Sequence, residues 1–261
     1  MNKRTWIAAL AAALLLVAEG AAFAQTAADF SVTLTEDGAG VVIKGYTGSV
    51  KAVRIPATIE GMPVREIERN SFEGKWITSV VIPNGVTSIG DRAFSMCELT
   101  SVTIPNSVTS IGAAAFYMCG SLTSVVIPAS VTSLGNGVFS ESGLTTISWG
   151  TGLAVIPKET FSRCRRLTKV VIPEGVTEIG ELAFSDCVTL SSVTLPSTIK
   201  KIGHRAFSQC EALASVTAPA SVTAVEFGGS AFSTSSYSGQ PSRLNLASQA
   251  LLKKLGYKDD F

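Results

Sequence analysis

The chain contains 261 residues, of which 46% are hydrophobic, so it is long and apolar enough to bury a sizeable core. Its 21 basic residues and 20 acidic residues almost cancel, and they form no extended basic run. Because nucleic-acid binding requires a concentrated positive field, this balance excludes a nucleic-acid partner from the expected functions.

The start of the chain has the features of an export signal. Lys3 supplies a basic start, residues 6–17 form an apolar run, and the small residue Ala24 precedes Gln25. A membrane anchor is the alternative, but this run is shorter than the roughly 20 residues that a spanning helix needs. The pattern predicts a signal peptide over residues 1–24 and no transmembrane segment after its removal. The mature protein is then exported, to the cell surface, the periplasm or the medium.

Residues 25–49 predict a hairpin that caps the region after it. The stretch "FSVTLTEDGAGVVIKGYTGS" has two apolar, strand-like halves, and Asp37, Gly38 and Gly40 lie between them. Residues of this kind favour a tight turn between two antiparallel strands.

One segment of 22 or 23 residues recurs through residues 50–232. The copy at residues 121–139 reads "SLTSVVIPASVTSLGNGVF", and every copy closes on a phenylalanine. These residues are Phe72, Phe94, Phe116, Phe139, Phe161, Phe184, Phe207 and Phe232. A period this short predicts a β-rich repeat solenoid of about eight coils.

Each part of the repeat has a physical role within one coil. "LTSVVIP" alternates apolar and polar residues like a half-buried strand, and its proline ends the strand because proline lacks a backbone donor. "VTSLG" ends in a glycine suited to a tight bend, and the phenylalanine fills the wide end of the coil. Stacked coils would place identical side chains on one another, with parallel strands about 4.8 Å apart.

Three copies depart from this pattern. The first contains an insertion, "EGMPV", after Ile59, and the last contains extra residues around "VEFGGSAF". The fifth has Trp149 and Gly150 where its neighbours have Ile and Pro. Trp149 either points into the core, with Gly150 and Gly152 making room for it, or lies exposed on a bulge as an aromatic anchor.

Residues 233–261 predict a linker and a C-terminal helical cap. The helix is expected over residues 244–257, "LNLASQALLKKLGY", with Gly256 as its C-terminal cap. A solenoid needs such caps because its end coils would otherwise expose the core.

The pattern LxxVxIPxxVTxIGxxAFxxC resembles the treponemal, or BspA-like, leucine-rich repeat family, over about residues 50 to 232. The resemblance implies a right-handed leucine-rich-repeat coil with parallel strands, an N-terminal hairpin cap and a C-terminal helix cap. Proteins of that family include adhesins that attach to host matrix proteins or to other bacteria. The resemblance therefore implies a protein ligand.

The five cysteines all occupy one position of the repeat, three residues after the phenylalanine. They are Cys97, Cys119, Cys164, Cys187 and Cys210, and Ser142 fills the same position in the one full copy that lacks a cysteine. This phase favours a buried ladder of free thiols. A disulfide between adjacent coils and a metal site are the alternatives, although ligand pairs with zinc spacing are missing. We therefore expect no metal and no cofactor.

No catalytic constellation can be assembled from the polar residues. His204 is the single histidine, and its phase places it on an outer turn rather than beside a nucleophile and a carboxylate. Glu181 holds the same position one coil earlier, so a surface charge pair between these coils is expected. The acidic residues of the sixth copy are expected to pair with basic residues of the seventh. They are Glu174, Glu178, Glu181 and Asp186, against Lys200, Lys201 and Arg205. The protein is not expected to be an enzyme.

Two surface features are candidates for binding. Arg163, Arg165 and Arg166 form a small basic group that is either an ordinary charged turn or a site for a sulfated glycan or an acidic partner. The outward residues of the repeated strands form a regular uncharged row, which we call the strand face. The strand face consists of Val81, Thr103, Val126, Ser148, Val171, Thr194 and Thr217.

The strand face admits two interpretations. Its β-branched residues either only favour strand formation or also form a flat ligand surface. With the resemblance, the second interpretation predicts an exported, adhesin-like surface protein that binds other proteins. The alternative is an envelope scaffold that binds cell-wall polymer or neighbouring envelope proteins.

Overall fold

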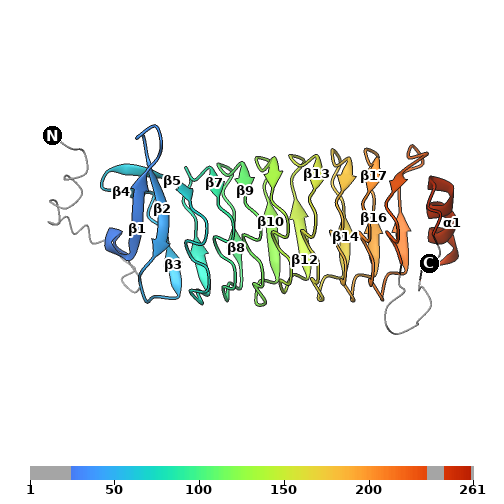
Figure 1. Cartoon of the computed structure of the whole chain (residues 1–261), viewed down its shortest axis with the longest axis horizontal. Helices are drawn as coiled ribbons and strands as arrows, with labels where there is room; N and C mark the ends of the chain where they lie inside the picture. Colours follow the sequence, from blue (N-terminus) through green and yellow to red (C-terminus); the bar gives the residue numbers. More distant parts are fainter. Residues whose placement is uncertain (1–24, 234–243, 260–261) are drawn as a thin grey trace.

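Eight coils of the repeated segment stack side by side into one elongated solenoid (Figure 1). The structure, a computed structural model, describes residues 25–233 and 244–259, so the predicted signal peptide and part of the predicted linker lie outside the described residues. A hairpin closes one end of the solenoid and a helix closes the other. The β-solenoid expected from the repeat is therefore confirmed.

The "IP" half of each coil forms the first row of strands, in which each strand is parallel to the next. Equivalent residues pair from coil to coil, as Val80 does with Val53 and with Val102. The row comprises β3 (Ala52–Arg54), β6 (Ser79–Val81), β8 (Val102–Thr103), β10 (Ser124–Ile127), β12 (Thr146–Trp149), β14 (Lys169–Val171), β16 (Ser192–Thr194) and β18 (Ser215–Thr217).

The "VTSIG" half of each coil forms a second row of short strands, and not only the bend that the sequence suggested. Most of its members are two residues long and parallel to their neighbours. The row comprises β5 (Met62–Ile67), β7 (Ser88–Ile89), β9 (Ser110–Ile111), β11 (Ser133–Leu134), β13 (Val155–Ile156), β15 (Glu178–Ile179), β17 (Lys201–Ile202) and β19 (Glu226–Phe227). The insertion after Ile59 lets β4 (Thr58–Ile59) pair antiparallel with β5.

The glycine after each second-row strand allows neighbouring coils to approach closely. A Cβ on Gly135 would lie 2.2 Å from the backbone nitrogen of Ala113 in the preceding coil. The Gly135 N–H donates to the Ile111 carbonyl at 2.7 Å. Contact with the adjacent backbone, rather than a tight bend, therefore accounts for glycine at this position.

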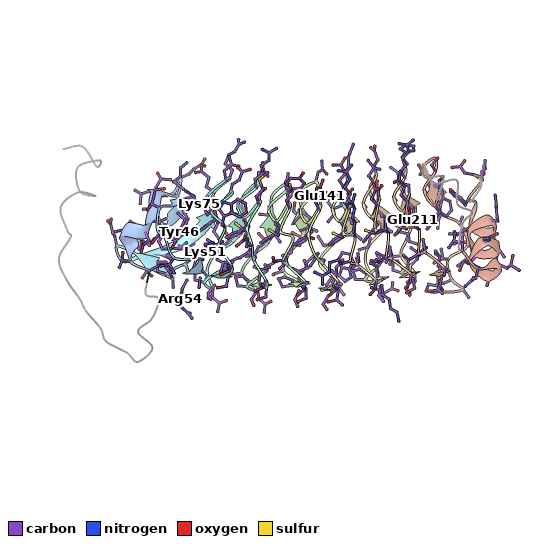
Figure 2. All side chains as sticks on the ribbon, turned by 90° about the horizontal axis from the view of Figure 1, so that it is seen from below. Tyr46, Lys51, Arg54, Lys75, Glu141 and Glu211 are labelled. Atoms are coloured by element: carbon purple, nitrogen blue, oxygen red, sulfur yellow. The ribbon has the colours of Figure 1, made fainter. Side chains whose placement is uncertain are left out.

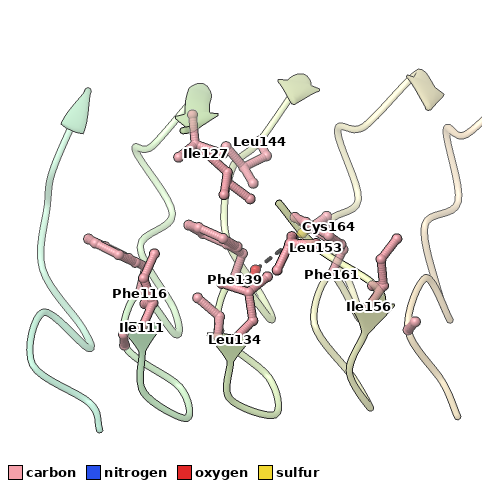
Figure 3. Close-up of a cluster of buried hydrophobic side chains, with 14 of the residues drawn as sticks. Ile111, Phe116, Ile127, Leu134, Phe139, Leu144, Leu153, Ile156, Phe161 and Cys164 are labelled. Carbon is pink, nitrogen blue, oxygen red and sulfur yellow. Dashed lines mark hydrogen bonds between the residues drawn. The ribbon is translucent and has the colours of Figure 1, made fainter. Parts of the chain in front are cut away.

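The eight phenylalanine rings form a continuous stack through the core. Successive ring centroids lie 4.9 to 5.5 Å apart, and the planes are inclined by 2 to 17°. Figure 3 shows Phe116, Phe139 and Phe161 in this stack, with aliphatic side chains such as Leu134 around them. Stacking at the repeat distance buries each ring against two others, which a single coil could not do.

The five cysteines line the core beside this stack, as expected. All are buried, and in each coil the Sγ donates to the carbonyl of a phenylalanine in a preceding coil, as Cys164 does to Phe139 at 3.2 Å (Figure 3). Burial raises the pKa of the Cys97 and Cys119 thiols to about 12. The ladder therefore consists of neutral thiols that hydrogen-bond to the backbone, and Ser142 takes the vacant place by contacting the Cys164 sulfur at 3.3 Å.

The turns beside each phenylalanine place non-glycine residues in the left-handed region. The residue two before the phenylalanine has positive φ in every coil, as does the residue two after it in the first seven coils. Ala114 (φ 55°) and Met118 (φ 55°) flank Phe116 in this way. The turn is held by bonds to the next coil, since the Phe116 N–H donates to the Val138 carbonyl at 2.8 Å.

The fifth coil, residues 140–161, exchanges the places of proline and glycine. Its first-row strand ends in Gly150, whose N–H donates to the Ile127 carbonyl at 2.7 Å, a bond that the usual proline could not make. Its second-row strand ends in Pro157, which cannot donate to Leu134. The second row accordingly breaks between β11 and β13.

The first row breaks between the fifth and sixth coils, between β12 and β14, whereas the second row breaks between the fourth and fifth. Trp149 lies at the end of β12, beside the break in the first row. Trp149 keeps the common register, opposite Ile127, and its ring packs edge-on against Phe161 at 5.3 Å. Its indole N–H donates to the Val171 carbonyl at 2.8 Å and so joins the two coils. Trp149 is half-buried, with the core packing expected in one of the two alternatives, whereas Gly150 and Gly152 accommodate the preceding turn rather than the indole.

Both ends of the solenoid are closed. At the first end β1 (Phe30–Leu34) and β2 (Val41–Tyr46) form the predicted hairpin after a short 3-10 helix, η1 (Ala27–Asp29). The side chain of Gln25 accepts from the Arg54 N–H at 2.6 Å and donates to the Ala52 carbonyl at 2.9 Å, as a neighbouring strand would.

At the other end, the predicted helix forms as α1 (Leu246–Leu255). Its N-terminus is capped by Asn245, and Gly256 ends it at φ 108°. Ser248 closes the edge of β18, because its hydroxyl accepts from the Val216 N–H at 2.9 Å and donates to the Val216 carbonyl at 3.3 Å. Within the described ranges, no helix combines the length and apolarity needed to cross a membrane.

Candidate partner-binding surface

All seven side chains of the strand face are exposed. Alternation along each strand turns the flanking Val and Ile residues toward the core and leaves the strand-face residue in solvent. In three strands the residue two positions earlier is exposed as well, namely Ser124, Thr146 and Lys169. Val126 and Val171 are 61% and 64% exposed, against 2% for Val125 beside them. The orientation predicted for this row is therefore confirmed, while a binding role stays a prediction.

The strand face consists of two registered blocks. Val81, Thr103, Val126 and Ser148 lie side by side on one sheet, and Val171, Thr194 and Thr217 lie on the next. The boundary is the joint that Trp149 bridges through its indole. Ser148 and Val171 therefore lie on either side of the break, and Val126 lies one strand before it.

Two exposed residues near the strand face were missed by the sequence analysis. Arg54 pairs in register with Val81 and so begins the row with a positive charge. Trp76 is 59% exposed and lies in the turn just before β6. The phase of the first coil could have revealed Arg54, and an aromatic residue at a turn position could have drawn attention to Trp76.

The ion pairs along the coil edges differ in part from the prediction. Glu178 pairs with Lys201 at 3.2 Å as expected. Glu181, however, pairs with Lys158 of the preceding coil at 3.3 Å, because its side chain points the other way along the solenoid. Glu174 accepts hydrogen bonds from the backbone and hydroxyl of Ser197, which lower the pKa of its carboxyl.

His204 is exposed on an outer turn, as its phase predicted. Among the described residues, it has no acidic side chain within ion-pairing distance, so the charge pair with Glu181 that its phase suggested is wrong. The described residues also hold no group of three His, Cys, Asp or Glu side chains placed to bind a metal ion.

The basic group lies on the edge that leads into the first row. Arg163 donates to Glu141 at 2.9 Å across one coil joint, and this partner raises the pKa of the Arg163 guanidinium. Arg165 and Arg166 are exposed at the mouth of a hollow of about 270 Å³. Figure 2 places Lys51, Glu141 and Glu211 at successive points along the solenoid.

Comparison with known proteins identifies the repeat. A family profile described as the BspA type leucine-rich repeat region matches residues 65–191 and 154–241, with six copies. The chain belongs to this family. The solenoid thus has the architecture of leucine-rich repeats, a fold whose members generally bind proteins.

Two solved structures of leucine-rich repeat proteins are similar to this chain over most of its length. The leucine-rich repeat protein of T. pallidum (TpLRR) is 31% identical, with a TM-score of 0.67, over 91% of this chain and 98% of that one. A leucine-rich repeat protein of Eubacterium ventriosum is 29% identical, with a TM-score of 0.56, over 77% of this chain and 63% of that one. A search of curated proteins finds no match.

Proposed function

We propose that this BspA-type leucine-rich repeat protein is an exported bacterial surface protein that binds another protein through the strand face. The observation that carries the proposal is the strand face itself, a row of exposed uncharged side chains on a rigid scaffold. Val126 and Val171 expose apolar side chains to water, and exposed apolar surface of this kind is typical of protein interaction sites. Solenoids of stacked repeats commonly bind partners through such extended surfaces.

The proposed location rests on the pattern of residues 1–24, and the adhesin-like role rests on resemblance within the family. Repeat folds carry many functions, so the partner has to be identified by experiment. A protein ligand is favoured because the row offers β-branched and hydroxyl side chains with almost no charge. Such a surface suits a complementary surface with an apolar centre and hydrogen-bonding rim.

The test measures binding of residues 25–261 to purified extracellular-matrix proteins and to cell-wall glycans. The test variant carries Val126→Ala, Val171→Ala and Thr194→Ala, all on exposed side chains. The matched control is Val155→Ala, because Val155 is also an exposed valine but belongs to the second row. Thermal unfolding of each variant shows that the fold is retained.

Saturable binding to a matrix protein that the triple variant loses and the control keeps would support the proposal. Binding to cell-wall glycan alone would instead support the envelope-scaffold alternative. Protease treatment of intact cells tests the location separately, since only a chain at the cell surface is cleaved without lysis.

A further inference from the structure

A hollow of about 270 Å³ lies on the coil edge, beside but separate from the strand face. It is lined by Gly120, Glu141, Ser142, Gly143, Arg163, Arg165 and Arg166. Its origin is a difference in length between neighbouring coils. One residue separates Ser142 from Leu144 in the fifth coil, whereas two residues occupy the same connection in the fourth and sixth coils. The shorter connection recesses the fifth coil between its neighbours.

Two glycines line the hollow, with Gly143 buried at its floor and Gly120 exposed at its open side. A Cβ on Gly143 would lie 2.0 Å from the Gly120 carbonyl oxygen, so only glycine permits this close approach. A Cβ on Gly120 would meet no atom within 4 Å, which places Gly120 at the open side. The backbone of both glycines is therefore not covered by side chains of their own.

The walls of the hollow carry an excess of positive charge. Three guanidinium groups and the single carboxylate of Glu141 line it, so the net charge is 3 − 1 = +2. Glu141 is already paired with Arg163 at 2.9 Å. Within the described residues, no carboxylate lies within 4.0 Å of Arg165 or Arg166, and both side chains are exposed.

We propose that this hollow binds an acidic polysaccharide, with a sulfate or carboxylate group held between Arg165 and Arg166. Guanidinium groups bind such oxyanions through paired hydrogen bonds. No apolar side chain lines the hollow, whereas peptide partners are usually anchored by apolar or aromatic side chains in a pocket. The polar walls and the exposed backbone of Gly120 suit a ligand made of hydroxyl and anionic groups.

The experiment measures binding of residues 25–261 to a heparin oligosaccharide, a hyaluronan oligosaccharide and poly-glutamate. Arg165→Ala with Arg166→Ala is expected to weaken oligosaccharide binding by about tenfold. Gly120→Glu should have a similar effect, because it adds a carboxylate at the mouth without a steric clash. Arg69→Ala with Arg92→Ala is the control, since it removes two exposed positive charges elsewhere.

Glu141→Gln gives a test in the opposite direction. It removes the internal partner of Arg163 and raises the net charge of the hollow, so binding should tighten by about threefold. This gain would not follow from damage to the fold. Thermal unfolding of every variant checks that the solenoid is intact.

Loss of binding in both hollow variants, with the control unchanged and Glu141→Gln tighter, supports the proposal. Binding of heparin alone assigns the site to sulfate, and binding of hyaluronan as well shows that carboxylate suffices. Equal weakening in the control would reveal general charge attraction and overturn the proposal, as would poly-glutamate binding as tightly as either oligosaccharide. These variants leave the strand face unchanged, so the outcome is independent of the proposed function.

Discussion

Replacing Phe116 by alanine should destabilise the solenoid at its centre. The side chain is completely buried, and its ring stacks at 5.4 Å on Phe94 and at 5.4 Å on Phe139. Truncation of a buried phenylalanine to alanine lowers the free energy of unfolding by about 3–5 kcal/mol. Each aromatic pair contributes about 0.5–1.5 kcal/mol beyond the burial of its surface, and part of this contribution is already included in that range. We expect a loss of about 4 kcal/mol, which is a large part of the stability of an ordinary domain.

Urea unfolding of residues 25–261 measures this loss, with Val126→Ala as the matched control. Val126 is 61% exposed in the coil that follows Phe116, so its truncation should change the free energy of unfolding by less than about 0.5 kcal/mol. Trp76 and Trp149 lie on opposite sides of Phe116 and are the two tryptophans of this segment. Variants that retain one tryptophan therefore report on each half of the solenoid.

Because repeats contact only their neighbours, Phe116→Ala should separate the unfolding of the two halves. Two transitions at different urea concentrations would show this separation. A loss below about 1 kcal/mol, or one equal to that of Val126→Ala, would contradict the assignment of inward and outward side chains.

Three further substitutions or conditions test the remaining features. Gly135→Ala should lower stability by about 2 kcal/mol in thermal unfolding, whereas Gly120→Ala should not, because only the first added methyl meets backbone. Met118→Gly should leave the unfolding midpoint unchanged or raise it, while Thr103→Gly should lower it, because only Met118 has positive φ. Burial raises the pKa of the Cys119 thiol to about 12, so unfolded thiols ionise first and stability should fall as pH rises from about 9 to 12. A flat pH profile in urea, or thiol labelling of the native protein at pH 8, would contradict the buried ladder.

The repeat and its caps could be predicted because short-range chemistry determines them. The phenylalanine spacing gives the coil length, and a long buried ring at a fixed phase has to stack on its neighbours. The hairpin and the helix follow from the turn residues near Gly38 and from the cap at Gly256. These inferences need no knowledge of how far one coil lies from the next.

Features that depend on the distance between coils could not be predicted. Gly135 resembles a bend residue in the sequence, and only the contact with Ala113 shows that it permits close backbone approach. Pro157 lies at the position where most other coils have glycine, and the sequence pattern did not draw attention to it. Its missing N–H explains the break in the second row. The partner of Glu181 depended on a side-chain direction that the spacing of charges does not contain.

The strand face lies between these two cases. Its orientation could be predicted because residues alternate along a strand, and the exposure of Val171 follows from that rule. Its division into two blocks could not, because the division depends on how the Trp149 indole reaches the Val171 carbonyl. The hollow was equally hidden, since the sequence shows the arginines but not the recess beside them.

The closed ends of the solenoid also determine whether it can polymerise. A stack of parallel strands with free edges would accept the end of a second copy, and repetition of that head-to-tail contact would produce a filament. Gln25 and Ser248 each offer one donor and one acceptor to the terminal strands, and so occupy the groups that such a copy would need. Both contacts therefore oppose head-to-tail pairing of two copies through the first row of strands.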